Sequence, residues 1–193
     1  RWARALGQVL REQGVRVSMV DKNPDNIMRA KQGGLNATCV DVVTETEFQT
    51  VNIQGIGYCL ALTNNEEVNT LAALHAHDMG FDRAEIFQIA MVNDEEDDDQ
   101  EPDPFQGRFL FDQQMSFQDV QNRFNKGWRV SCWEMEDEEE VSEVESKIPD
   151  SLLPVIRLRD PNKVKVLTDM QDLDLKPGDR LVALQETALD EDQ

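Results

Sequence analysis

The chain has 193 residues, of which 39 are acidic and 19 basic, so its formal net charge is −20. This charge argues against a nucleic acid or an anionic lipid surface as a partner, because the phosphate groups of both would be repelled. The charge is also uneven: residues 94–193 carry 28 acidic and 11 basic side chains, whereas residues 1–93 carry 11 and 8. Length and charge together predict two modest domains.

The first half alternates short apolar runs with helical patterns. Helical spacing of apolar residues opens the chain over residues 2–13. The predicted strands span residues 15–20, 37–40, 58–62 and 85–92, and the main helices between them span residues 23–32 and 66–79. Alternation of this kind predicts an α/β fold with a Rossmann-like parallel sheet, whose first strand is missing from the chain.

The second half has a different character. Residues 94–104 contain no apolar side chain and are expected to form an extended acidic linker. Beyond them the patterns predict a helix over residues 116–124, strands over 128–135, 152–158, 163–167 and 180–184, and a solvated acidic loop over 134–145. The expected domains are residues 1–93 (Rossmann-like), the linker 94–104, a β-rich α+β domain over 105–187, and an acidic tail over 188–193.

Three cysteines, Cys39, Cys59 and Cys132, lie far apart in the sequence. Their odd number and spacing predict neither a disulfide framework nor a CxxC-type site, and fit a reducing cytosol. No apolar stretch approaches the roughly 18 to 20 residues that cross a bilayer. Any membrane-spanning part is therefore expected outside this chain.

The residues after the predicted strands are the candidates for ligand binding. A Rossmann site uses a carboxylate at the end of the second strand to bind ribose hydroxyls, and Asp21 stands about 20 residues after the place of the glycine loop. Ala3, two residues after Arg1, would take the third small position of that loop, with both glycines upstream of the chain. Asp41 and the Thr63-Asn64 pair follow the next strands. All of these polar residues could instead serve only as caps.

Catalytic and metal chemistry is not predicted. His75 and His77 are two residues apart on a helix, so they point to different sides and cannot share a metal ion. Leu62, and not lysine, follows Tyr58 at the spacing of the Tyr-x-x-x-Lys pair of short-chain dehydrogenases. No Gly-x-Ser-x-Gly elbow occurs, and the acidic runs lack the ligand spacing of a calcium loop.

Three segments, residues 17–24, 34–41 and 62–69, resemble the RCK fold, also called KTN or TrkA-N. The resemblance covers nearly all of residues 1–93. The segments 153–157 and 175–182 resemble the companion TrkA-C domain, whose final strand follows a Pro-Gly-Asp turn. By this resemblance, Asp21 would bind the adenosine ribose and Asp41 would lie beside the adenine. The remaining residues implied at the cofactor site are Lys22, Thr63, Asn64, Asn69 and Arg1, of which Thr63, Asn64 and Asn69 would border the phosphates.

The resemblance implies a non-catalytic sensor of an adenine nucleotide: NAD(H), AMP, ADP or ATP. The expected partners are a second copy, in a homodimer or larger assembly, and a transmembrane ion-transport domain on whose cytoplasmic side the chain would lie, with neither nucleic acid nor lipid bound directly. Residues 109–135 resemble the tails of bacterial sodium or potassium/proton antiporters. Two alternatives stay open: a soluble subunit or channel gating domain of a potassium transport system, and an NAD-dependent oxidoreductase.

Overall fold

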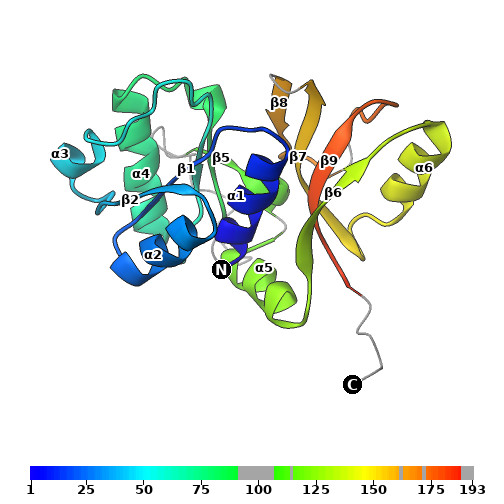
Figure 1. Ribbon diagram of the computed structural model, residues 1–193, viewed down its shortest axis with the longest axis horizontal. Coiled ribbons are helices and arrows are strands. Elements are labelled where there is room, and N and C mark those ends of the chain that lie inside the picture. The colour runs from blue at the N-terminus through cyan, green and yellow to red at the C-terminus, as the bar shows by residue number, and fades with distance from the viewer. Residues whose placement is uncertain (91–106, 114, 161–162, 171–172, 188–193) are drawn as a thin grey trace, which may run out of the picture. The chain divides into compact units, whose positions relative to one another are not determined.

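The computed structural model describes residues 1–90, 107–113, 115–160, 163–170 and 173–187. Residue contacts divide the chain into two compact units (Figure 1): Arg16–Gln118, here called the parallel unit, and Arg1–Val15 with Asp119–Gln193, the antiparallel unit. The linker predicted over residues 94–104 and the tail predicted over 188–193 lie outside the described residues.

The parallel unit begins with a strand, a helix and a second strand: β1 (Ser18–Asp21), α2 (Pro24–Gln32) and β2 (Asn36–Cys39). Asn23 caps α2, because its side-chain oxygen accepts the backbone N–H of Asp25 at 2.9 Å, and Pro24 then supplies the favoured first helical residue. β1 and β2 pair in parallel, with Asp21 opposite Cys39. The apolar side of α2 packs against these strands in a small core made of Ile27, Ala30, Leu35 and Ala37.

A second parallel sheet has the order β3-β4-β5. Its strands are β3 (Cys59–Ala61), β4 (Ile86–Gln88) and β5 (Arg108–Phe109), and the helical elements of this region are α3 (Glu45–Phe48), α4 (Glu66–Asp78), η1 (Arg83–Glu85) and η2 (Leu110–Gln113). Alanines on one side of α4 let the helix approach the sheet closely. They join the core formed by Val40, Phe48, Val51, Ala73, Ala76, Phe81 and Ile86.

The predicted parallel sheet is therefore present in two pieces, β1-β2 and β3-β4-β5. In the doubly wound strand order 3-2-1-4-5-6, the strand that joins these two pieces is the first one. β2 and β1 correspond to positions 3 and 2, and β3, β4 and β5 to positions 4, 5 and 6. No strand of the described residues occupies position 1, which explains why β1 and β3 are not hydrogen-bonded to each other.

The antiparallel unit contains a four-stranded sheet with the order β6-β9-β7-β8. The unit contains most of α5 (Phe117–Asn125), whose first two residues belong to the parallel unit, and all of β6 (Arg129–Glu134), α6 (Glu138–Ser146), β7 (Leu152–Asp160), β8 (Lys163–Val166) and β9 (Arg180–Gln185). The predicted hairpin is confirmed, because β7 and β8 pair antiparallel with Ile156 opposite Val166. The predicted final strand is confirmed as well, and it lies between β6 and β7.

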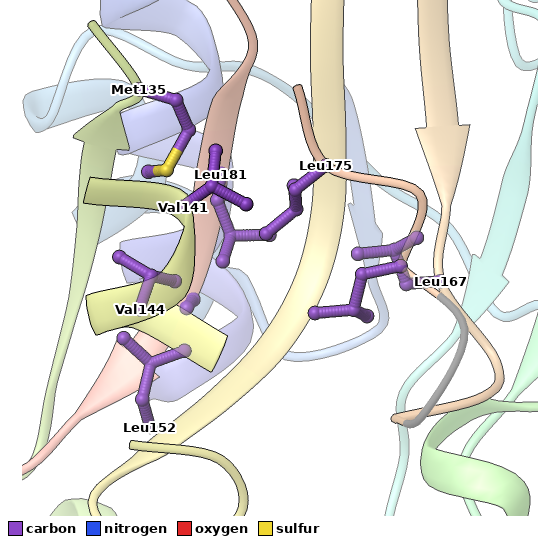
Figure 2. Close-up of a cluster of buried hydrophobic side chains, with 9 residues drawn as sticks. Met135, Val141, Val144, Leu152, Leu167, Leu175 and Leu181 are labelled. Atoms are coloured by element: carbon purple, nitrogen blue, oxygen red, sulfur yellow. The ribbon is translucent and has the colours of Figure 1, made fainter. Parts of the chain in front are cut away.

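The acidic segment 134–145, predicted as a solvated loop, is mostly helical, so that prediction is wrong. Asp137 caps α6 by accepting the backbone N–H groups of Glu139 and Glu140 at 2.9 and 3.0 Å. Acidic side chains in the first turn also favour a helix electrostatically. Val141 and Val144, three residues apart, are both buried in the core of the sheet (Figure 2), so tertiary packing stabilises a helix that its charge alone would not predict.

Helix α1 (Trp2–Glu12) belongs to the antiparallel unit, where it packs against β6 and β9. Its buried residues Trp2, Leu6 and Leu10 recur at helical spacing. Beyond its end, Arg180 of β9 donates a hydrogen bond from Nη1 to Oε1 of Gln13 at 2.6 Å. Helix α1, near the start of the sequence, thus packs against a sheet that includes β9, which lies near its end. Of the helices in the described part of the chain, none combines the length and apolar character of a membrane span.

Candidate functional site

Asp21 stands at the carboxyl end of β1, as predicted, and its side chain is partly buried. Oδ1 accepts the backbone N–H of Asn23 at 2.8 Å, and Oδ2 accepts Nδ2 of Asn26 at 2.8 Å. Asp21 therefore fixes the turn into α2, as expected if it had only a structural, capping role. A carboxylate offers about four acceptor positions, so two remain for hydroxyl donors and the binding interpretation is compatible with the same geometry.

Asp41 lies shortly after β2, next to the end of β1. Its carboxylate is 3.8 Å from Nζ of Lys22, an ion pair between exposed side chains that contributes little stability by itself. The loop after Asp41 is ordered locally, since Oδ1 accepts the N–H of Val43 at 3.1 Å and Glu47 accepts the N–H of Asp41 at 3.0 Å. The structure thus brings Asp21, Lys22 and Asp41 to one edge of the β1-β2 sheet.

A second polar group follows β3 and is centred on Asn69, which is fully buried. Its Oδ1 accepts both the N–H of Thr63, at 3.0 Å, and the hydroxyl of Thr63, at 2.7 Å. Its Nδ2 donates to the carbonyl of Thr63 at 3.2 Å. Because these contacts use most of the amide, Asn69 shapes the turn before α4, whereas Asn64 is exposed at its tip.

The predicted residues of the parallel unit therefore fall into two groups: Asp21, Lys22 and Asp41 at the ends of β1 and β2, with Lys22 and Asp41 forming an ion pair, and the hydrogen-bonded pair Thr63 and Asn69 after β3. Arg1 belongs to the antiparallel unit, where it is exposed and precedes α1. Sequence reasoning missed Asn26 and Glu47. A capped helix start signals that polar side chains gather there, but no periodic pattern links Asn26 to Asp21 five positions earlier.

A charged cluster in the antiparallel unit was also missed. The buried Arg157 donates to the carbonyl of Leu173 at 2.9 Å and to Oδ2 of Asp174 at 2.9 Å, and Arg159 binds both carboxylate oxygens of Asp179 at 2.8 and 2.9 Å. Hydrogen bonds from Lys176 and then Arg157 lower the pKa of Asp174 to about 2. Burial raises the pKa of Asp179, but the bonds from Arg159 and the backbone of Lys176 outweigh it, so this pKa is also lowered. These groups are mutually paired and fix the turn before β9.

Oxygen acceptors at the carboxyl ends of parallel strands, each followed by a capped helix, are the features of a Rossmann-like nucleotide-binding domain. Comparison with known families agrees, because the TrkA-N domain matches residues 1–100. The chain belongs to the TrkA-N domain family. TrkA-N domains are regulatory, nucleotide-binding domains of potassium transport systems and in general bind NAD(H)-like nucleotides. A comparison with curated proteins found no match.

Proposed function

We propose that this chain is a non-catalytic, nucleotide-sensing regulatory region that controls a membrane cation/proton antiporter. The observation that carries the proposal is the Asp21 carboxylate, which is held at the end of β1 by two donors and keeps two acceptor positions for a ribose diol. It lies within the span that matches the TrkA-N family. We propose an adenine nucleotide, NAD(H) or AMP, ADP or ATP, as the ligand.

The charges at this edge favour a nucleotide without a 2′-phosphate. Such a phosphate would meet the carboxylate of Asp21, and the nearby cation, Lys22, lies 3.8 Å from a second carboxylate, that of Asp41, so the edge carries two acids against one base. A carboxylate at this position accepts free ribose hydroxyls and repels a phosphate in their place. The proposed ligand is therefore NADH in preference to NADPH.

The antiparallel unit supports the proposal of a TrkA-C-like domain. Its last strand, β9, follows the Pro177-Gly178-Asp179 turn, in which Gly178 has a φ of 88° and Asp179 accepts the N–H of Lys176 at 3.0 Å. We propose that nucleotide binding shifts a dimeric regulatory region between two arrangements, and that an attached transporter, with this chain on its cytoplasmic side, responds to the shift. A chain that stays monomeric in light scattering would contradict the dimer.

Two other functions remain as alternatives. A soluble subunit or a channel gating domain of a potassium transport system would use the same domains. An oxidoreductase would need a proton donor at the nicotinamide, and the two histidines are poorly suited to that role. Nδ1 of His75 lies 2.8 Å from the carbonyl of Val42, and Nδ1 of His77 lies 3.2 Å from that of Phe81. Both imidazoles thus have structural partners.

Calorimetric titration with NADH and AMP tests the proposed function, using the full chain and Asp21→Ala. Loss of two charge-assisted acceptors is expected to weaken binding by roughly tenfold to a hundredfold. Asp21→Ala is also expected to lower stability by about 1–2 kcal/mol, because Asn23 and Asn26 lose their acceptor.

Asp137→Ala is the matched control, since Asp137 also accepts two donors at a helix start but lies in the antiparallel unit. It is expected to lower the melting temperature without changing nucleotide affinity. Equal affinities of wild type and Asp21→Ala would leave Asp21 with a capping role only.

A further inference from the structure

Asn26 lies at this edge beside Asp21, and the family match assigns it no role. It occupies the third helical position of α2, where a polar side chain commonly reaches back to the N–H of the capping residue. Here that N–H, on Asn23, is already bonded to Oδ1 of Asp21 at 2.8 Å. Asn26 reaches further back, and its Nδ2 donates to Oδ2 of the same carboxylate at 2.8 Å.

The bond from Asn26 is not needed to cap α2. The side chain of Asn23 accepts the N–H of Asp25 at 2.9 Å, and Pro24 has no N–H to satisfy. The backbone of Asp21 is fixed independently by pairing with β2, where Val40 donates to its carbonyl at 3.2 Å. What the Asn26 amide adds is control over the rotation of the carboxylate.

We propose that Asn26 is a positioning residue, which holds the Asp21 carboxylate so that its two free acceptor positions face the 2′- and 3′-hydroxyls of a bound ribose. This role rests on the proposed nucleotide-binding function. The residue type fits the role, because an amide donates to a carboxylate without adding charge. A glutamate, the more usual residue of a capping box, would repel Asp21.

The test compares the affinities of AMP and 2′-deoxy-AMP by calorimetry, in the wild-type chain, Asn26→Ala and Asn26→Asp. Asn26→Asp keeps the size of the side chain and suits the first turn of a helix, but it replaces the donor with a second carboxylate. Wild type is expected to prefer AMP by about tenfold or more. Both variants are expected to reduce that preference to roughly threefold or less.

Gln49→Ala is the matched control, because Nε2 of Gln49 also donates to a carboxylate, that of Glu45, at 2.9 Å in the same unit. It should keep the full preference for AMP. A general loss of stability would weaken the binding of AMP and of 2′-deoxy-AMP alike. Loss of positioning would instead change the ratio of the two affinities.

The outcomes separate this inference from the proposed function. If wild type prefers AMP and the Asn26 variants keep that preference, the positioning role is wrong and nucleotide binding stands. If wild type binds both ligands equally, Asp21 does not contact the 2′-hydroxyl: the positioning role is wrong, and nucleotide binding remains but without the ribose contact proposed for it. If wild type binds neither AMP nor NADH, both proposals fail.

Discussion

The polar side chains after the parallel strands differ in how many hydrogen-bonding positions they keep for a ligand. Asp21 and Asn69 show the two extremes. Asp21 uses two of about four acceptor positions within the turn. The amide of Asn69, in contrast, is hydrogen-bonded to the backbone and the hydroxyl of Thr63. Direct ligand contact is therefore expected from Asp21, and an indirect, shaping role from Asn69.

The paired acids of the antiparallel unit give a prediction about acid stability. The pKa of Asp174 is lowered to about 2 and that of Asp179 is also lowered, whereas an aspartate in the unfolded chain has a pKa of about 3.9. Because the folded pKa values are the lower ones, these groups stabilise the fold above about pH 4 and lose that effect as the pH falls towards 2. We therefore expect the melting temperature to fall less in Asp174→Asn than in wild type when the pH is lowered from about 5 to about 2.5, a range that includes the unfolded pKa and approaches the folded one. Thermal unfolding at several pH values measures this difference.

Asp150→Asn serves as the control for this measurement, because Asp150 is an exposed carboxyl of the same unit. The melting temperature of Asp150→Asn should fall on acidification by as much as that of wild type. Identical acid curves for wild type and Asp174→Asn would show that the pairs with Arg157 and Lys176 contribute nothing measurable.

At the residue scale, polar residues that are marked by their position next to a strand or a helix could be predicted from the sequence. Residues whose partners are distant in the sequence could not. Asp21 was found because it ends an apolar run before a capped helix. Arg157 and Arg159 were not, because their partners Asp174 and Asp179 lie 17 and 20 residues away across a turn. Charge pairs at that separation leave no periodic signal in a chain with this many acids.

At the scale of elements, strands and amphipathic helices were predictable because their apolar residues repeat. The order of short strands and capped helices in residues 15–92 is close to the observed β1 to β4. The exception is α6, where seven acids among residues 136–145 obscured two apolar positions. Val141 and Val144 fit a helical face only once a sheet is present to cover them.

Helix α1 gives a prediction at this scale. Leu6 is 2% exposed on the face that packs against β6 and β9, so Leu6→Ala removes buried methyl groups and leaves a cavity. Its expected cost in the free energy of unfolding is about 2–5 kcal/mol. Glu12→Ala, on an exposed position of the same helix, should change that free energy by less than about 0.5 kcal/mol.

Urea unfolding followed by circular dichroism measures both changes. If Leu6→Ala and Glu12→Ala are equally stable, the packing of α1 on the antiparallel sheet is not a determinant of stability.

For the whole molecule, the division into units was less predictable than the elements. The TrkA-N match covers residues 1–100, including α1, yet the contacts of α1 place it with residues 119–193. An amphipathic pattern shows that a helix has an apolar face, but it does not identify the surface that covers that face. The predicted boundary at residues 94–104 stays a prediction, because it lies outside the described residues.

The net charge of −20 predicts how salt affects ligand binding. A negatively charged nucleotide is repelled at long range, and the Debye length falls from about 30 Å at 0.01 M salt to about 8 Å at 0.15 M. The association rate constant for NADH should therefore rise severalfold over this range, measured by stopped-flow fluorescence. Adenosine, which is uncharged, should show little change. A rate constant for NADH that falls with salt would indicate a locally positive approach to the site.

The bond between Gln13 and Arg180 also bears on how the protein is made. The two residues are 167 positions apart, so α1 leaves the ribosome well before β9, the later of the two strands that it packs against. At about 5–20 residues per second, the interval is roughly 10 to 30 s. Throughout that time the apolar face formed by Trp2, Leu6 and Leu10 lacks its final partner. During translation, a chaperone that recognises apolar surface would have this interval in which to bind the helix.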